Sequence, residues 1–432
     1  MRRPTQVMSA LVLAITICAP VGAAVVEPGQ LITPGNASLV AALVSPGNFI
    51  LVRQGMQMKI GATGRIDFPP PYQDATEKYS GQVTLNQKGE LEHYVAGLPF
   101  PLIDPNDPQV ATKVMWNLSF GPELADTIQV NNVEVTGTRA GGGWLFGGLI
   151  FDDTTDLTFY SAIGRTEVDP IPANPNFAGR GIRSTFSVSG ALTRIRYTDP
   201  NVADDAFIFG YGRVAATVLS DSAKGNIDAD SYFGFGAKIE DFNYRLLGIA
   251  PMLASVHAEH SPAKACQFDN SERPCPENWE IRTLYVIEAT EKPRPWHKLI
   301  GSAGVSIPKR ILYVDSEGWF VTASDQYNRS GGLWKTLAIF TGYRDRSMPE
   351  AQVAIYPFKR LFQTAMIDED IEDTMRFTSI LYLPGTEVAE HEGWGTEVAE
   401  HEGWYIDAGA IIHASTYAAA AKLINEYPGN TR

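Results

Sequence analysis

The sequence has few of the residues on which catalysis and metal binding usually depend. Its 432 residues include three cysteines and seven histidines, and no histidine stands beside a convincing nucleophile. A GxSxG turn and an HExxH helix are both missing. These absences argue against an enzyme, and we expect no catalytic residue, no cofactor and no metal.

Long apolar runs are also scarce. Arg2 and Arg3 precede an apolar run over residues 8–20, which closes on small residues at Gly22 and Ala23. This pattern predicts a cleaved signal peptide over residues 1–23 and export to the periplasm, and it leaves association with the outer membrane open. No later stretch reaches the ~20 apolar residues that a membrane helix needs. One domain is therefore expected over residues 24–432.

Basic residues are outnumbered, with 35 Lys and Arg against 49 Asp and Glu and a net charge of -14. An acidic surface repels phosphate backbones, so nucleic acid is excluded as a partner. The 39 glycines, 28 prolines and 44% hydrophobic content are typical of a folded chain with many turns.

Alternation of apolar and polar residues with a period of two dominates the mature chain. Residues 182–197 alternate in this way and predict two strands that turn near Gly190, with one face exposed to water. Further strands are expected at the ranges 157–163, 207–211, 281–290, 310–314 and 319–324, the last two joined by a tight turn at 315–318. Strands that follow one another through short turns favour a mainly β, antiparallel fold.

Few segments have helical spacing. Asp107 and Pro108 predict the start of a helix that continues to Leu118. A second helix is expected after Asn36, ending near Pro46, and a third over residues 415–426.

Two mature cysteines, Cys266 and Cys275, flank a short polar segment. In an oxidising periplasm this pair favours a disulfide over a metal site, because no second Cys or His pair lies beside it at ligand spacing. Residues 385–394 and 395–404 both read GTEVAEHEGW, an exact tandem repeat. Since solenoids need at least three longer units, we expect the extra copy over 385–404 to loop out.

A glycine-rich segment at 139–153 reads RAGGGWLFGGLIFDD. It lacks the Lys-Ser/Thr pair of a phosphate-binding loop. Its apolar side chains, Trp144 and Phe146 among them, need an apolar partner, which is either the core or a ligand.

Six blocks spread over the mature chain carry a family resemblance. They are YVAGLPFPLIDPNDPQVATKVMWN at 94–117, RYTDPNVADDAFIF at 196–209, DFNYRLLG at 241–248, LYVIEATEKP at 284–293, RILYVDSEGWFVTASDQYNRSGGLWK at 310–335 and HEGWYIDAG at 401–409. As a set they resemble a proteobacterial periplasmic family of undetermined function that is described as similar to outer-membrane lipoprotein-sorting proteins.

The resemblance implies a curved antiparallel sheet that forms an incomplete barrel, covered by a few helices around an apolar cavity. It brings no catalytic residues. It also implies traffic of a lipid or another hydrophobe beside an exporter of the resistance-nodulation-division type and an outer-membrane protein. One departure concerns residues 209–218, FGYGRVAATV, which keep Arg213 where relatives tend to carry two adjacent arginines.

The resulting hypothesis is a periplasmic binding or carrier protein for a lipid or other hydrophobic molecule. The residues expected to line its cavity are Trp116, Trp144, Phe146, Phe207, Phe209, Tyr211, Tyr285 and Trp319. Two alternatives stay open, an adaptor between an exporter and an outer-membrane protein that binds no ligand, and an unrecognised hydrolase. A further possibility is that these side chains simply pack on one another.

Overall fold

The computed structural model describes residues 26–122, 127–139, 149–160, 178–186, 190–197, 205–210, 213–217, 222–223, 230–258, 276–293, 305–344, 352–353, 360–372, 375–380 and 387–391. Within these residues no helix is both long enough and apolar enough to cross a membrane.

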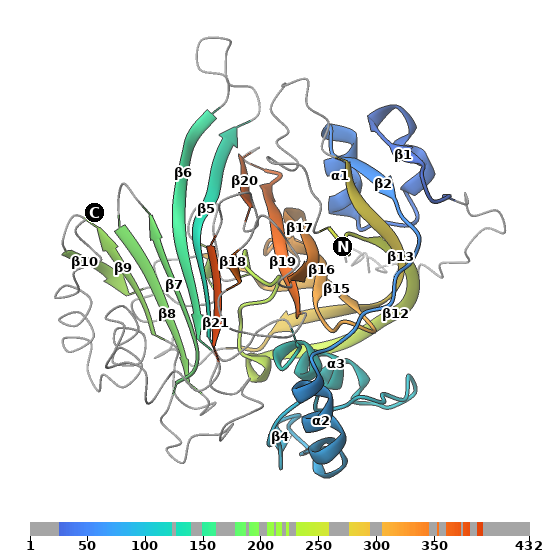
Figure 1. The fold of residues 1–432 in the computed structure, drawn as a ribbon, viewed down its shortest axis with the longest axis vertical. Coiled ribbons are helices and arrows are strands. Elements are labelled where there is room, and N and C mark those ends of the chain that lie inside the picture. Colours follow the sequence, from blue (N-terminus) through green and yellow to red (C-terminus); the bar gives the residue numbers. More distant parts are fainter. Residues whose placement is uncertain are drawn as a thin grey trace, which may run out of the picture.

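One large curled sheet organises the molecule (Figure 1). Neighbouring strands along it pair antiparallel in the order β10 (Arg213–Thr217), β9 (Asp205–Gly210), β8 (Gly190–Tyr197), β7 (Ala178–Phe186), β6 (Leu149–Tyr160) and β5 (Thr127–Arg139). Strand β5 then pairs with both β20 (Met375–Ile380) and β21 (Glu387–His391). The order continues from β20 through β19 (Arg360–Asp370), β17 (Leu333–Arg344), β16 (Val321–Tyr327), β15 (Lys309–Asp315) and β13 (Pro276–Glu291) to β12 (Phe242–Ala254). This is the predicted mainly β, incomplete barrel.

Short strands complete the sheet and make it mixed in two places. Strand β2 (Gln57–Ile60) pairs parallel with the start of β13, and β1 (Leu31–Ile32) pairs antiparallel with β2. Strand β18 (Gln352–Val353) pairs parallel with β21. Two small ribbons, β3 (Thr84–Leu85) with β4 (Leu91–Glu92) and β11 (Ser222–Ala223) with β14 (Val305–Ser306), stand apart from the sheet. The expectation of a purely antiparallel sheet is corrected at these two parallel pairs.

The central strands are buried on both faces. In β17 the consecutive residues Leu337, Ala338, Ile339 and Phe340 are all at most 1% exposed. Successive side chains of a strand point to opposite faces, so both faces of the sheet must be covered here. Ile339 belongs to one apolar cluster, whereas Ala338 and Phe340 belong to another.

The first cover is the N-terminal module, which we define as residues 26–60. It contains β1, the 3-10 helix η1 (Pro34–Val40), α1 (Pro46–Gln54) and β2. Its apolar side chains, among them Leu51, Val52 and Met58, pack with Trp279 and Phe340 on one face of the sheet. The module lies beside β13 at the upper right of Figure 1.

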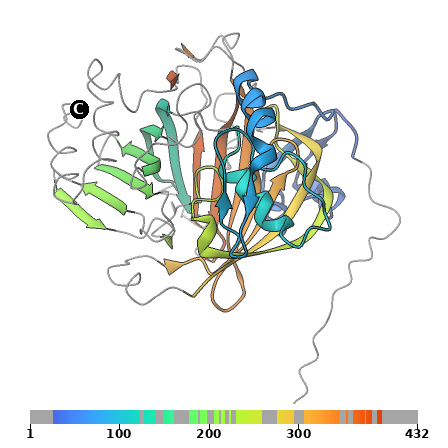
Figure 2. The same cartoon turned by 90° about the horizontal axis from the view of Figure 1, so that it is seen from below.

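The second cover is the cap, which we define as residues 68–122. It contains α2 (Pro70–Tyr79), η2 (Ser80–Gln82), the β3–β4 ribbon and α3 (Val110–Ser119). Its apolar side chains pack on the opposite face, against residues such as Ile339 and Leu312. A further short helix, η4 (Ile239–Asp241), adjoins α3 and precedes β12. Figure 2 shows the cap helices in front of the yellow-to-orange strands.

Several sequence predictions are confirmed in detail. Strands β7 and β8 pair across the turn that was expected near Gly190, with Phe186 opposite Gly190. The turn at 315–318 joins β15 to β16, and the Asp315 carboxylate accepts hydrogen bonds from the backbone N–H groups of Glu317 and Gly318 at 2.9 and 2.7 Å. The helix predicted from Asp107 and Pro108 is α3, which begins slightly later, at Val110.

One helix prediction is wrong in its position. The segment after Asn36 is a 3-10 helix, and Pro46 starts α1 instead of ending a helix. The Ser45 side chain accepts from the Asn48 N–H at 3.0 Å, so Ser45 is an N-cap and Pro46 occupies the first turn, where a missing N–H costs nothing. The helix predicted at 415–426 lies outside the described residues.

The tandem repeat contributes one strand. Residues Glu387–His391 of the first copy form β21, which pairs with β5. The second copy, at 395–404, lies outside the described residues, so the prediction that one copy loops out stays a prediction.

Candidate binding face

The face of the sheet beneath the cap carries a continuous set of apolar side chains, which we call the apolar face. Strands β12, β13, β15, β16 and β17 contribute to it, together with the turn residue Trp319. Its members are Phe242, Tyr285, Ile287, Ala289, Leu312, Val314, Trp319, Val321 and Ile339. All are buried, and the cap residues that pack on them are mainly Val110, Val114, Met115, Trp116 and Phe120.

Three of the predicted cavity residues meet here. Tyr285 and Trp319 stack with ring centroids 5.9 Å apart and planes inclined by 20°. Trp116 stacks on Phe120 within the cap, in the same apolar cluster. Burial raises the pKa of the Tyr285 hydroxyl. Sequence analysis left open whether such side chains contact the core or a ligand, and in this structure these three contact the core.

Of the other five predicted residues, two belong to β9 and three lie outside the described residues. Phe207 and Phe209 belong to β9, where their register partners on β8 are Thr193 and Ala191. Trp144, Phe146 and Tyr211 lie outside the described residues, as do Cys266 and Cys275.

Hydrogen bonds within the cap satisfy its own polar groups. The Tyr72 hydroxyl donates to the Phe120 carbonyl at 2.7 Å, and the Trp116 indole N–H donates to the Gly89 carbonyl at 2.8 Å. The buried Asn117 amide both accepts from the Phe100 N–H and donates to the Phe100 carbonyl, at 2.9 and 2.8 Å. The cap is thus a small unit with its own polar interior, and its contact with the apolar face is made by apolar side chains.

A short segment, which we call the strap and define as residues 61–67, connects the N-terminal module to the cap. It is held along its length by the sheet. The Gly61 N–H donates to the Trp279 carbonyl at 2.8 Å, the Thr63 hydroxyl to the Ile281 carbonyl at 2.9 Å, and the Asp67 N–H to the Tyr343 hydroxyl. The strap therefore anchors the beginning of the cap.

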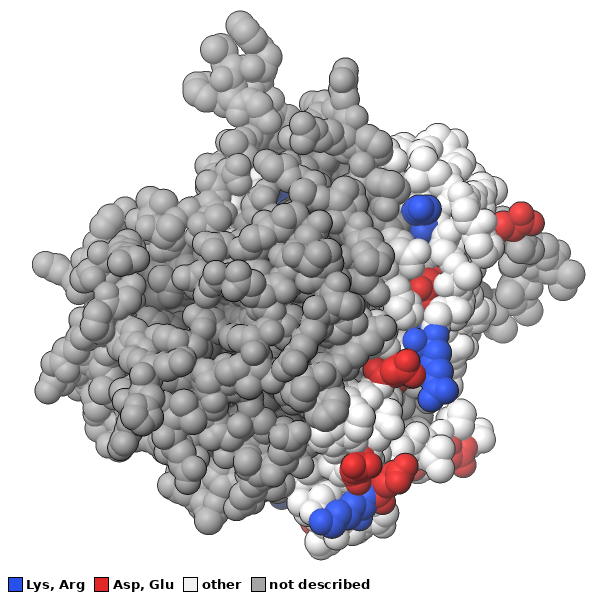
Figure 3. Space-filling view, viewed as in Figure 1, with Lys and Arg blue, Asp and Glu red and all other residues white. Residues whose placement is uncertain are grey.

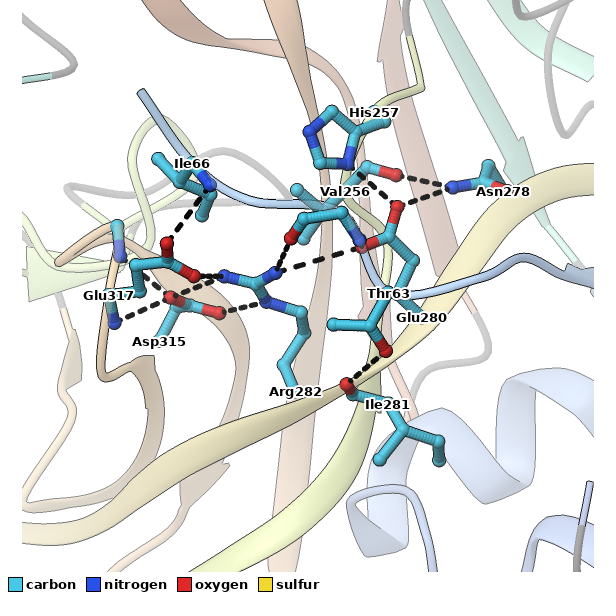
Figure 4. Close-up of polar contacts among 12 residues, drawn as sticks. Thr63, Ile66, Val256, His257, Asn278, Glu280, Ile281, Arg282, Asp315 and Glu317 are labelled. Carbon is cyan, nitrogen blue, oxygen red and sulfur yellow. Dashed lines mark hydrogen bonds and ion pairs between the residues drawn. The ribbon is translucent and has the colours of Figure 1, made fainter. Parts of the chain in front are cut away.

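A buried charged cluster forms hydrogen bonds to the backbone in the middle of the strap (Figure 4). Arg282 of β13 donates to Asp315 at 2.8 Å, to Glu317 at 2.6 Å and to the Gly64 carbonyl. Glu280 accepts from the Gly64 N–H at 2.9 Å and contacts His257 Nδ1 at 2.7 Å. The side chains of Arg282, Glu280 and Asp315 are at most 3% exposed. Such a cluster holds its backbone partners in place, because separating them would leave buried charges unpaired.

Position 64 requires glycine for a steric reason. A Cβ atom there would lie 2.6 Å from Cε1 of His257, whose own backbone has a positive φ of 56°. The sequence predictions did not include this cluster. Its available signal was the pair Glu280 and Arg282, whose two-residue spacing places both side chains on one face of β13.

A second polar cluster adjoins the apolar face. Arg310 precedes Leu312 and Val314 on the same face of β15, and its guanidinium lies 4.9 Å from the Phe242 ring centre and 5.6 Å from that of Phe235. Its register partner is Gln326 of β16, which in turn pairs with Lys335 of β17. All three side chains are fully buried.

Two buried carboxylates, Asp230 and Asp368, form ion pairs with Arg310 and Lys335 respectively. Asp230 accepts from Arg310 Nε and, at 3.1 Å, from the Gln326 amide. Asp368 accepts from Lys335 at 3.0 Å and from the Ser231 hydroxyl at 2.8 Å. The sequence signal here was Arg310, whose two-residue spacing from Leu312 and Val314 puts a charged side chain on an apolar face of β15.

On the opposite face a buried carboxylate joins the N-terminal module to the sheet. Asp325 of β16 accepts from the Thr336 hydroxyl at 2.9 Å, the Ser45 hydroxyl at 3.2 Å and the Gly47 N–H at the start of α1. Burial raises the pKa of Asp325 to about 6, although these hydrogen bonds act to lower it.

Charges on the described surface are interspersed. Figure 3 shows basic and acidic side chains alternating down the visible described face. Two such pairs are Arg245 with Glu288 at 2.9 Å and Lys113 with Asp107 at 2.5 Å. An exposed pair such as Arg245 with Glu288 contributes little to folding, so the burial of apolar and paired polar groups must hold the fold together.

Taken together, the curled sheet and its two covers define a half-barrel protein. Residues 31–365 match a family described as "Protein of unknown function (DUF1329)", and the chain belongs to this family. The family predicted from the sequence is thereby confirmed. No curated protein matches the chain.

Three solved structures are similar to this chain at low sequence identity. A putative outer membrane lipoprotein-sorting protein domain from Vibrio parahaemolyticus has 12% identity and a TM-score of 0.37, covering 60% of this chain and 84% of that one. A DUF1329 family protein from Desulfovibrio piger has 12% identity and a TM-score of 0.38, with 65% and 91% covered. A LolA superfamily protein from Nitrosomonas europaea has 15% identity and a TM-score of 0.33, with 62% and 90% covered.

Proposed function

We propose that this protein is a periplasmic carrier that binds a lipid or another hydrophobic molecule between the cap and the apolar face of the half-barrel. The observation that carries the proposal is a difference between two sets of contacts. Hydrogen bonds connect residues inside the cap, and apolar side chains connect the cap to the sheet. Polar groups such as Asn117 and the Trp116 indole are satisfied within the cap, whereas the cap contacts the sheet through apolar side chains.

An attachment of this kind can be exchanged for a ligand. When the cap moves off the sheet, the hydrogen bonds of Asn117 and of the Trp116 indole travel with it, so these two buried groups keep their partners. The cost is the exposure of apolar surface, at ~25 cal/mol per Å². An acyl chain that enters covers that surface again, and ~16 methylenes contribute at most ~13 kcal/mol before ordering costs.

Three of the residues that we propose to contact the ligand lie in the apolar cluster beneath the cap. Trp116 belongs to the cap, Tyr285 to β13 and Trp319 to the turn before β16. The remaining predicted positions, Trp144, Phe146, Phe207, Phe209 and Tyr211, stay part of the proposal. The expected exporter of the resistance-nodulation-division type and the outer-membrane partner also stay predictions.

Lipid extraction tests this proposal. Full-length mature protein is purified without detergent, extracted with organic solvent and analysed by mass spectrometry. We expect a stoichiometric apolar compound, and we expect the delipidated protein to bind the fluorescent probe 1-aminoanthracene. Absence of both an extracted compound and probe binding would overturn the carrier function.

Two tryptophan variants place the binding site. Trp319→Phe alters the apolar face and is expected to reduce the change in tryptophan emission on ligand binding. Trp279→Phe is the matched control, because Trp279 is equally buried but packs on Phe340 on the opposite face. Equal effects of the two variants would argue against a site beneath the cap.

A further inference from the structure

The buried polar cluster beside the apolar face contains polar atoms that the protein leaves without a partner. Among the described residues, Arg310 Nη2, Gln326 Oε1 and Ser324 Oγ have no hydrogen-bond partner, and all three residues are fully buried. Native proteins rarely leave buried polar atoms in this state, so each such atom calls for an explanation.

These three atoms gather on one face. Arg310 and Gln326 are register partners, and both side chains reach the same Asp230 oxygen, which brings their terminal groups together. Ser324 lies two residues before Gln326 on β16 and pairs with Leu312, a member of the apolar face. Residues two apart on a strand share a face, so the cluster continues the apolar face without a break.

We infer that this cluster binds the polar head of an amphipathic ligand whose apolar chain lies along the apolar face. The inference rests on the proposed carrier function and specifies its ligand. Arg310 Nη2 supplies a donor, Gln326 Oε1 an acceptor and Ser324 a hydroxyl that serves as either. A head with both a carbonyl oxygen and a hydroxyl group complements all three.

The charge balance of the cluster selects an uncharged head. Arg310 is paired with Asp230, and Lys335 is paired with Asp368, so the cations already have carboxylate partners. A carboxylate or phosphate head would add an uncompensated charge in a fully buried place, which is strongly unfavourable. The ligand class is therefore a neutral acyl ester that carries hydroxyl groups, such as a monoacylglycerol.

Competition binding with delipidated full-length protein tests this inference. Bound 1-aminoanthracene is displaced by monopalmitoylglycerol, by methyl palmitate, which lacks the hydroxyl groups, or by palmitate, which carries a charge, each below its micelle concentration. We expect monopalmitoylglycerol to bind ~10-fold or more tightly than either of the others, as one well-placed buried hydrogen bond allows.

Two variants assign the preference to the cluster. Ser324→Ala removes one of the three groups with little change in volume, and Gln326→Met removes another; each should reduce the preference for monopalmitoylglycerol ~10-fold while methyl palmitate binds as before. Ser324→Ala is the safer variant if Gln326→Met folds poorly. Trp279→Phe removes the unpartnered Trp279 Nε1 on the opposite face and should leave the preference unchanged.

The outcomes separate the two proposals. Equal binding of the three ligands, with no response to Ser324→Ala, would mean that buried water alone satisfies these atoms, and would overturn the head site while leaving the carrier function intact. Preference for palmitate would overturn the neutral head. Failure of the probe and of all three ligands to bind would refute the carrier function itself.

Discussion

The N-terminal module and the cap follow one another in the sequence and cover opposite faces of the same strands, yet they are attached by different chemistry. Both covers pack through apolar side chains, but the module also joins the sheet through backbone and charged groups: β2 pairs with β13, the Leu253 N–H donates to the Leu43 carbonyl at 2.7 Å, and the start of α1 is held by Asp325. The cap packs on its face through apolar side chains.

Under the proposed function, this difference lets the sheet keep the module in place while the cap moves. Moving the module would break a strand pairing and uncover the buried Asp325 carboxylate, whose partners lie in α1 and β17. Moving the cap exposes apolar surface, which a hydrophobic ligand can cover again. The strap is hydrogen-bonded to Arg282 and Glu280, and it separates the N-terminal module from the cap along the chain.

The largest expected effect comes from disrupting the charged cluster around Arg282, which holds the strap between the two covers. Arg282→Ala leaves the carboxylates of Glu280 and Asp315 buried without their cation, which should lower the free energy of unfolding by about 3–5 kcal/mol. Urea denaturation of the two proteins measures this loss. Arg245→Ala, at the exposed pair with Glu288, is the matched control and should cost less than about 1 kcal/mol. Similar losses in both variants would contradict the anchoring role of the cluster.

A substitution that leaves a void beneath the cap should destabilise the cap more than the N-terminal module. Met115→Ala removes a fully buried side chain of α3 and should cost about 2–5 kcal/mol. Hydrogen exchange is expected to speed up in residues 68–122 more than in residues 26–60. The reason is that apolar contacts hold the cap on the sheet, and the substitution removes some of them. Leu51→Ala in α1 is the counterpart in the module and should speed up exchange across the whole sheet. A uniform increase in the Met115→Ala variant would remove the distinction between the covers.

The attachment of the module should depend on pH through Asp325. The pKa of Asp325 is raised from 3.8 to about 6 in the folded protein, so the protonated form is the one that folding favours. The resulting stabilisation is fully present below the unfolded pKa of 3.8 and is lost as the pH rises through about 6. Relative to Asp325→Asn, which does not titrate, the wild-type protein should therefore lose up to about 3 kcal/mol between pH 4 and pH 7.

Denaturant titrations of both proteins at several pH values measure this difference. A gap between the two proteins that stays constant from pH 4 to pH 7 would show that Asp325 titrates at its ordinary pKa. A gap that widens in favour of the wild type as the pH rises would reverse the sign of the prediction.

The smallest expected effect concerns the start of α1. Ser45→Ala removes the acceptor for the Asn48 N–H and one donor to Asp325, which should lower the free energy of unfolding by about 1 kcal/mol. Thermal unfolding followed by circular dichroism detects such a change. No measurable loss would mean that Asp325 and Gly47 hold the helix without the cap residue.

Local chemistry made part of this structure readable in advance. The turn at 315–318 could be predicted because Asp315 bonds the backbone N–H groups that follow it, and β7 with β8 because alternation and Gly190 mark a hairpin. Pro46 misled the helix prediction, since a proline ends one helix and begins another equally well, and the N-cap at Ser45 decides between them.

The candidate site was predicted in part for the same reason. Trp116, Tyr285 and Trp319 were chosen as large apolar side chains on strands and a helix, and they do lie in one cluster. The charged cluster around Arg282 and the polar one around Arg310 were not predicted, because their partners come from segments far apart in the chain. Gly64 lies 218 positions before Arg282, and Asp230 lies 80 positions before Arg310.

The sequence by itself determined the mainly β character of this protein, its tight turns, helix α3 of the cap and the family to which it belongs, because each is written in short runs of neighbouring residues. The tertiary structure alone decided which face each cover occupies and which buried charges meet. Those features depend on contacts between distant segments, and their free energy exists only once the sheet has brought the segments together.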